Sequence, residues 1–247
     1  MMLALWVVQV RVRDATHVDV GWAYCLGFLA VLYAALGDGD ASHRILIAVL
    51  GGLWSLRLGT YLVRNRLLGK PEDGRYAALR AKWGARASRR FFVFFQVQAG
   101  FDIVFSVPFL LVAFNGHDGL EPLEWAGVGL WVAGMIGETT ADRQLARWRA
   151  DPANHGKTCR AGLWQLSRHP NYFFEWTIWV GYATAADAAP WGGIGWVAPA
   201  LLTFLLFRIT GIPATEAQAL RSRGEDYRRY QQETSVFVPW FPRRRLS

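Results

Sequence analysis

Cysteine and histidine are scarce in this chain, which has 247 residues with two cysteines and five histidines. Cys25 falls in an apolar run and Cys159 in a polar loop, so we expect the two not to pair. No group of histidines and cysteines has the spacing of metal ligands. A glycine-rich phosphate loop, an internal repeat and a low-complexity tract are also missing. These absences exclude a disulfide scaffold and a repeat architecture, and we expect no metal site.

Charged residues are few as well, at 19% of the chain, whereas hydrophobic residues make up 53%. Soluble domains of this length are seldom so apolar, and the charges are separated from the apolar runs. The pattern predicts an all-α, polytopic integral membrane protein with six to seven transmembrane helices. The predicted spans are residues 20–36, 45–63, 91–114, 123–141, 171–188 and 194–212.

The first ten residues are apolar, but a full span needs about 20 residues. We expect a short first helix there. The alternative, a signal peptide, lacks the charged start and the small-residue cleavage site. The length of the chain suits one membrane-embedded domain over residues 1–247.

Basic residues fall in blocks along the chain. Of the 27 lysines and arginines, 23 lie in three segments, namely residues 64–90, residues 142–170 and the tail from Arg208 onward. The loops that separate the intervening spans contain none. Basic residues gather on the cytoplasmic side of a membrane, so we predict that these segments face the cytoplasm of a bacterial inner membrane. The net charge of +8 therefore indicates membrane topology, is compatible with a pocket for an anionic cofactor, and does not indicate nucleic-acid binding.

Polar and aromatic side chains share one predicted face of the second span. Intervals of three and four residues separate Trp54, Arg57, Tyr61 and Asn65, so a helix would align them. Arg57 lies about two helical turns inside the apolar run. Its side chain either extends toward the membrane interface or lines a cavity with its aromatic neighbours.

A second polar face continues out of the fourth span. It carries Glu138, Asp142, Leu145 and Arg149, again at helical intervals. This face either forms a surface network beyond the bilayer or contacts a cofactor. In the second case, Asp142 would accept hydrogen bonds from ribose hydroxyls or an amide, and Arg149 would bind a phosphate.

The stretch SRHPNYFFEWTIWVGY carries the densest signal. Pro170 suits the first position of a helix, and the free N–H groups of that helix would form an anion site beside Arg168 and His169. Asn171 and Glu175 would share a face, with Glu175 one turn deeper. An acid inside a membrane helix indicates function by default. The alternatives are a structural hydrogen bond for Glu175 and a helix cap or interfacial role for His169.

Four stretches together resemble the steroid 5α-reductase family, and more closely its bacterial members of the DUF1295 type. They are WSLRLGTYLVRNRLLGKPEDGRY, ADRQLARW, GLWQLSRHPNYFFEW and TEAQALRSRGEDYRRYQQETSVFVPWFP. The resemblance covers most of the chain from about Asp19 onward. RHPNY alone is also shared with isoprenylcysteine methyltransferases and related lipid methyltransferases.

This resemblance implies a seven-helix membrane enzyme that uses NADPH to reduce the 4,5 double bond of a 3-oxo-Δ4 steroid or a similar apolar enone from the bilayer. It makes Glu175 the catalytic acid at the 3-keto oxygen. It places Trp54 where eukaryotic relatives carry a substrate-contacting tyrosine, whose task an indole cannot perform. The positions assigned to the cofactor are Arg57, Asn65, Lys70, Asp142, Arg149, Arg168, His169, Asn171, Tyr172 and Glu216.

The implied reaction gives a physical reason for Glu175. Hydride transfer to an enone pushes negative charge onto the ketone oxygen, and a donor fixed there is worth about 3 kcal/mol. A carboxyl desolvated in an apolar helix can stay protonated and donate, so we predict that Glu175 is neutral in that step. Two other hypotheses stay open: a membrane methyltransferase that uses S-adenosylmethionine, and a non-catalytic lipid-binding protein.

Overall fold

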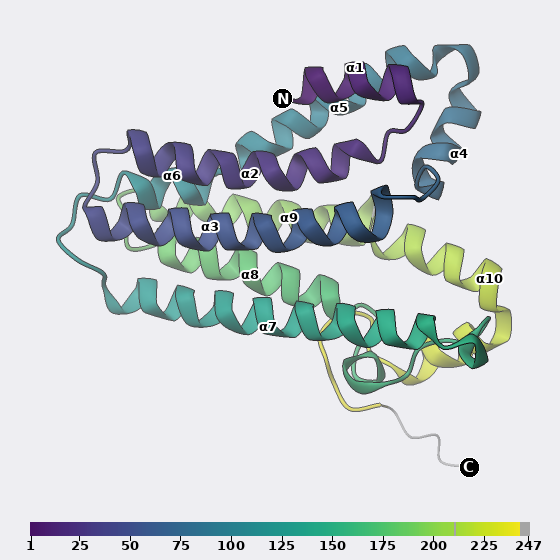
Figure 1. Ribbon diagram of the computed structural model, residues 1–247. Coiled ribbons are helices and arrows are strands. Elements are labelled where there is room, and N and C mark those ends of the chain that lie inside the picture. The colour runs from purple at the N-terminus through teal and green to yellow at the C-terminus, as the bar shows by residue number, and fades with distance from the viewer. Residues whose placement is uncertain (210, 243–247) are drawn as a thin grey trace. The chain divides into compact units, whose positions relative to one another are not determined.

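The computed structural model describes residues 1–209 and 211–242 (Figure 1). Three arginines of the basic tail, Arg243, Arg244 and Arg245, lie outside the described residues. The structure is 78% helical and has no strand in the described ranges, where one isolated parallel bridge joins Ser167 to Ser235. The prediction of an all-α membrane protein is confirmed.

The α-helices follow one another with short connections. They are α1 (Met2–Val12), α2 (His17–Leu36), α3 (Ala41–Leu62), α4 (Gly74–Trp83), α5 (Ala87–Phe105), α6 (Val107–Ala113), α7 (Pro122–Ala150), α8 (Pro170–Ala186), α9 (Val197–Arg208) and α10 (Ile212–Glu233). A π-helix, η1 (Val63–Leu67), extends α3. Short 3₁₀-helices are η2 (Gly84–Arg86), η3 (Pro152–Asn154), η4 (Gly162–Gln165) and η5 (Gly192–Trp196).

The helices divide into two compact units. The first comprises Met1–Glu121 and Ala186–Val197, and the second comprises Pro122–Ala185 and Ala198–Ser247. The prediction of one domain over the whole chain stays a prediction.

In the first unit, α2 and α3 pack against each other through small residues. A Cβ added to Gly51 would lie 2.4 Å from the Ala30 Cβ, and one added to Gly27 would lie 2.2 Å from the Ser55 Oγ. Such close approach lets two apolar helices gain dispersion contacts where the hydrophobic effect offers little. Asp40 begins α3, because its side chain accepts a hydrogen bond from the Ser42 backbone N–H at 3.0 Å.

Ion pairs fix the segment after α3 to the start of α2. The Asp19 carboxylate accepts hydrogen bonds from Arg75 at 2.8 Å and from the Tyr76 hydroxyl. Glu72 pairs with Arg80 at 2.7 Å and accepts from the Ala15 backbone N–H at 2.8 Å. The arginines of α4 are therefore balanced by acids.

The predicted span 91–114 consists of two helices that meet at Ser106. The Ser106 hydroxyl donates to the Ile103 carbonyl at 2.9 Å. Pro108 follows, and its ring allows no backbone N–H for a continuous helix. The expected short first helix is present as α1, which lies along α5 (Figure 1).

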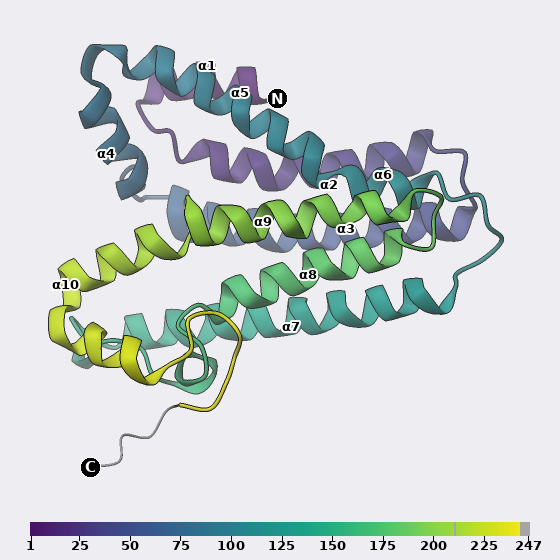
Figure 2. The same ribbon diagram turned by 180° about the vertical axis from the view of Figure 1, so that it is seen from behind.

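In the second unit, α7 and α8 lie side by side in both views (Figures 1 and 2). Glycines of α7 form the contact. A Cβ added to Gly127 would lie 2.6 Å from the Gly181 carbonyl oxygen, and one added to Gly134 would lie 2.8 Å from the Phe174 carbonyl oxygen. Only residues without side chains let the two backbones approach this closely.

The polar end of the second unit is formed by α10 and the 151–167 loop. Helix α10 is kinked at Gly224, whose φ of 51° lies in the left-handed region. The loop is attached to α7, since Trp164 Nε1 donates to the Ala141 carbonyl and Leu163 N donates to Gln144 Oε1, both at 2.9 Å. It is attached to α10 as well, since Thr158 N donates to Asp226 at 2.7 Å.

Four segments among the described residues are long and apolar enough to cross a membrane. They are His17–Leu36, Ala41–Leu67, Gly74–Ala113 and Gly192–Glu233. The predicted spans 123–141 and 171–188 correspond to α7 and α8, which are not among these four; α8 has only 17 residues. The total of six to seven transmembrane helices therefore stays a prediction.

The contact between α7 and α8 yields a test of stability. We expect Gly134→Ala to lower the free energy of unfolding by about 1–3 kcal/mol, because the new methyl group has no room. Gly129→Ala on the same helix is the control, since nothing lies within 4 Å of its added Cβ. It should be neutral or stabilising by up to about 1 kcal/mol. Thermal unfolding in detergent measures both, and equal stability of the two variants would contradict this packing.

Candidate functional site

The residues just before α8 are bonded to α10 and to the C-terminal segment, which is the part of the second unit that follows α10. The Ser167 hydroxyl donates to the Phe237 carbonyl at 2.7 Å, and Arg168 N donates to the Ser235 carbonyl at 2.8 Å. The Tyr230 hydroxyl donates to the Ser167 carbonyl at 3.1 Å. Pro170 then begins the helix, as predicted from its fixed φ. The backbone that carries Arg168 and His169 is therefore fixed before the helix starts.

Glu216, on the first turns of α10, is the centre of the polar network at this helix start. Its Oε1 atom lies 3.1 Å from Arg168 Nε and 3.2 Å from His169 Nε2. Its Oε2 atom accepts a hydrogen bond from Gln231 Nε2 at 2.7 Å. Arg168 also donates through NH1 to the Gln231 carbonyl at 3.1 Å. One carboxylate thus joins the start of α8 to both ends of α10.

His169 is almost completely buried, with 3% of its surface exposed. Its ring stacks on the Tyr172 ring, with centroids 5.3 Å apart and planes inclined by 6°. The Tyr172 hydroxyl shares a hydrogen bond with the Thr215 hydroxyl at 3.2 Å. Arg168, His169, Tyr172 and Glu216, all predicted to bind the cofactor, therefore form one network. Their role in binding a cofactor stays a prediction.

Glu175 lies one turn further along α8 and is half-buried. Its Oε1 atom accepts a hydrogen bond from Trp179 Nε1 at 2.8 Å. This contact is made within α8. Glu175 takes part in further interactions, so the alternative of a structural hydrogen bond to a neighbouring helix stays open. Further along α8, the buried Tyr182 hydroxyl accepts a hydrogen bond from the Trp131 indole of α7 at 2.9 Å. The catalytic role of Glu175 stays a prediction.

Asn171 is in the first turn of α8 and is half-buried. Within the described residues, its side-chain amide makes no hydrogen bond. The amide therefore keeps a donor and an acceptor for a ligand at a helix start, where the unpaired N–H groups favour anions.

The polar face predicted on α7 contains both buried and exposed residues. Asp142 and Glu138 are buried, with 6% and 5% of their surface exposed, whereas Arg149 is exposed near the end of the helix. Burial raises the pKa of the Cys159 thiol, against the opposing effects of the Ala161 backbone N–H and the Arg149 charge. Cys159 is therefore not a reactive thiolate, and Arg149 lies close to the loop that carries it.

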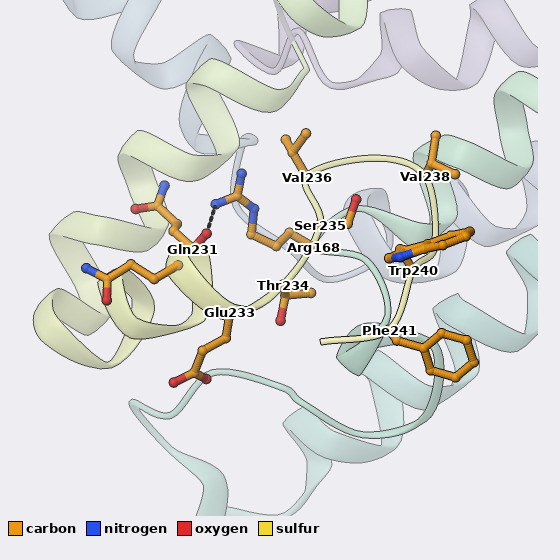
Figure 3. Close-up of a pocket in the computed structure, with 10 residues that line it drawn as sticks. Arg168, Gln231, Glu233, Thr234, Ser235, Val236, Val238, Trp240 and Phe241 are labelled. Atoms are coloured by element: carbon orange, nitrogen blue, oxygen red, sulfur yellow. Dashed lines mark hydrogen bonds between the residues drawn. The ribbon is translucent and has the colours of Figure 1, made fainter. Parts of the chain in front are cut away.

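A cavity of about 480 Å³ opens beside Arg168 in the second unit (Figure 3). Figure 3 shows the Arg168 side chain reaching toward Gln231, while the C-terminal segment curves around the other side. The lining residues are Arg168, Gln231, Gln232, Glu233, Thr234, Ser235, Val236, Val238, Trp240 and Phe241. Trp240 and Phe241 are 69% and 80% exposed, so two aromatic faces are available at the cavity rim.

The remaining predicted residues lie in the first unit. Trp54 is fully buried in α3 and packs edge to face on Trp22, with centroids 5.7 Å apart. Arg57 is half-buried, and its guanidinium lies 5.7 Å from the Tyr61 ring centroid. Arg57 therefore contacts an aromatic neighbour, but a role for Arg57 and Trp54 in binding a ligand stays a prediction.

Asn65 departs from the expected regular helix, because it lies in the π-helix Val63–Leu67. The wider i→i+5 turn shifts it from the position that four-residue spacing predicts. Its amide donates to the Tyr61 carbonyl at 2.9 Å. Lys70 follows in the exposed segment before α4. The cofactor roles of both residues stay predictions.

Sequence reasoning missed the part played by the C-terminal segment. Gln231 and Ser235 bond to Arg168, and Thr215 bonds to Tyr172, so each contacts a residue at the start of α8 that is more than 40 positions away in the sequence. Contacts at that separation leave no periodic pattern. No cluster of three or more His, Cys, Asp or Glu able to hold a metal occurs in the part of the chain that the structure describes.

The network around Glu216 yields a second test. We expect Glu216→Gln to lower the free energy of unfolding by about 1.5–3 kcal/mol, because it leaves Arg168 without its half-buried anionic partner. Glu225→Gln, also on α10, is the control. Glu225 is 62% exposed and pairs with Arg228 at 3.8 Å, so its loss should cost less than about 1 kcal/mol. If thermal unfolding in detergent gives the same small loss for both, Glu216 does not hold the site together.

Two comparisons with known proteins match nearly the whole length of the chain. A family model described as "Protein of unknown function (DUF1295)" matches residues 5–234. The chain is also similar to "Uncharacterized protein C594.04c" of Schizosaccharomyces pombe, with 26% identity over 269 residues that cover 95% of this chain and 75% of the relative. No solved structure matches. Because the family model spans both units and nearly every helix, the chain belongs to the DUF1295 family.

Proposed function

We propose that the chain is a membrane oxidoreductase that uses NADPH to reduce the carbon–carbon double bond of an apolar enone, such as a 3-oxo-Δ4 steroid. The observation that carries the proposal is the Glu175 carboxyl, held by Trp179 one turn inside a helix whose start is rich in anion-binding groups. The relation of the DUF1295 family to steroid 5α-reductases supports it.

The groups at the start of α8 fit an anionic dinucleotide. They combine a guanidinium, an imidazole, a helix N-terminus and the Asn171 amide, which makes no hydrogen bond within the described residues. The cavity beside Arg168 has a volume typical of ligand pockets. Glu216 offsets part of the positive charge. We assign the phosphate groups to Arg168 and the helix start, the nicotinamide amide to Asn171, and the support of this wall to His169, Tyr172 and Glu216.

In the proposed reaction, Glu175 is the residue that acts on the substrate. Bound NADPH supplies the hydride. A neutral Glu175 carboxyl donates a hydrogen bond to the ketone oxygen, where negative charge develops as the β-carbon is reduced. The Trp179 N–H, 2.8 Å from Oε1, keeps the carboxyl in one orientation, so no reorganisation is needed during the reaction. The aromatic side chains of α8 give the acid an apolar surrounding.

For the other predicted residues, we propose the roles that the family resemblance implies. Arg57, Asn65, Lys70, Asp142 and Arg149 would bind polar and charged parts of NADPH, and Trp54 would contact the substrate. We also propose that the cofactor enters from the cytoplasmic side of a bacterial inner membrane, because the basic segments are expected there.

Ligand-dependent stability tests the cofactor. For the full chain in detergent, NADPH at one hundred times its Kd should raise the free energy of unfolding by about 2.7 kcal/mol. S-adenosylmethionine should have no effect. The same preparation should oxidise NADPH when progesterone, testosterone or androstenedione is added, and the product should have the mass and the 5α stereochemistry of the saturated ketone.

The competing hypotheses predict different results. Stabilisation by S-adenosylmethionine alone would identify a methyltransferase. No stabilisation by either compound, together with no oxidation of NADPH by any enone, would indicate a non-catalytic lipid-binding protein. Either result contradicts the proposed reductase.

Substitution of Glu175 tests the catalytic step. We expect Glu175→Leu to lower kcat about 100-fold, since one donor to the developing oxyanion is lost. Glu175→Gln should also fall below the wild type, because an amide is a weaker donor than a neutral carboxyl. Asp187→Asn is the matched control: Asp187 also accepts from an indole N–H, that of Trp196, at 2.8 Å. Turnover by Asp187→Asn should stay within about twofold of the wild type, and wild-type turnover by Glu175→Gln would refute the role of the acid.

A further inference from the structure

A second cavity lies in the first unit, where α4 leads through η2 into α5. Its volume is about 580 Å³, within the range of known ligand pockets. It is lined by Trp83, Arg86, Arg89, Arg90, Val93, Phe94 and Val97. No acid is among the lining residues, and neither the candidate site nor the proposed reaction uses any of them.

The arginines of this cavity differ from those of the adjoining helix. Arg75 and Arg80 of α4 are paired with Asp19 and Glu72. In contrast, Arg86, Arg89 and Arg90 are exposed and form no ion pair within the described residues. Three positive charges therefore lie together at one end of the cavity, and no acid of residues 1–209 or 211–242 forms an ion pair with them.

One wall of the cavity fixes part of this charge. The Arg90 guanidinium lies 5.9 Å from the centroid of the Trp83 ring, a cation–π distance. Trp83 is half-buried and also packs edge to face on the buried Phe91 at 4.9 Å. The indole therefore holds Arg90 at the cavity, where its remaining N–H groups can bind an anion bidentately.

The other end of the cavity is apolar. Val93 and Val97 are 57% and 47% exposed, and Phe94 lies beside them. Arg89, Val93 and Val97 recur at four-residue intervals on α5, so they follow one stripe, and Arg86 precedes it at the end of η2. From Arg89 to Val97, the stripe is about 12 Å long at 1.5 Å per residue. The cavity is therefore basic at one end and apolar along the next two turns of a segment long and apolar enough to cross a membrane.

We propose that this cavity binds an anionic phospholipid, with the headgroup phosphate at the three arginines and the upper part of an acyl chain along Val93 and Val97. Unpaired arginines beside membrane helices attract anionic headgroups. A free phosphate or a nucleotide would satisfy the charge but would leave the exposed valines without a partner. A zwitterionic lipid would cover the valines, but its net charge of zero would offset none of the positive charge, whereas an anionic headgroup offsets part of it.

Lipid binding to the delipidated full chain in neutral detergent tests the proposal. Native mass spectrometry and thermal unfolding should show binding and stabilisation by dioleoyl phosphatidylglycerol. Dioleoyl phosphatidylcholine and inorganic phosphate, at the same concentration, should show much less. The triple variant Arg86→Gln, Arg89→Gln, Arg90→Gln should bind phosphatidylglycerol at least about tenfold more weakly. Because these side chains are exposed, its unfolding temperature without lipid should match the wild type.

A charge-matched control separates the cavity from the net charge of the protein. Arg221, Arg228 and Arg229 are exposed residues of α10, and their triple change to Gln removes the same charge. This control should bind phosphatidylglycerol within about twofold of the wild type. Equal loss in both triple variants, equal binding of the two lipids, or equal stabilisation by inorganic phosphate would overturn the proposal.

Discussion

The Glu216 carboxylate pairs with Arg168 and His169 and accepts a hydrogen bond from Gln231, and the candidate site depends on this set of contacts. Without it, two basic groups at the positive end of the α8 dipole would face each other with little compensation. With it, the positive charge is reduced but not removed, and the helix start keeps a defined geometry. The same contacts join α10 to the start of α8, and two of the residues that they hold, Arg168 and Gln231, line the cavity of Figure 3.

The arginines of the first unit illustrate two uses of one residue type. Arg75 and Arg80 are matched by acids and fix the segment before α4 to the start of α2. Arg86, Arg89 and Arg90 form no ion pair with any acid in the part of the chain that the structure describes. A membrane protein can leave such a cluster uncompensated where lipid headgroups supply the anions. Ion pairs within the chain therefore distinguish the arginines that stabilise the fold from the arginines that we propose to bind a ligand.

Local patterns predicted the apolar helices, but they predicted neither the charged helices α4 and α10 nor the contacts between distant residues. Apolar runs produce helices because a helix satisfies its backbone within one segment, and Pro170 marked the start of α8 for the same local reason. Pro108 is the one local sign in the sequence of the break at Ser106. Glu216 was placed near the site through family resemblance alone, because its partners lie 47 and 48 residues away. The indole that contacts Glu175 stands four residues after it, but α8 contains two tryptophans, Trp176 and Trp179, and the sequence alone does not show which one donates.

The π-helix at residues 63–67 has a consequence for how this family can vary. An i→i+5 turn accommodates one residue more than the regular helix around it. A residue gained or lost at this turn would rotate the following segment, which carries Lys70, without disturbing the glycine contacts of α3 upstream. An insertion or deletion of one residue could therefore change the direction in which the loop leaves the helix. The packing of α3 would stay the same.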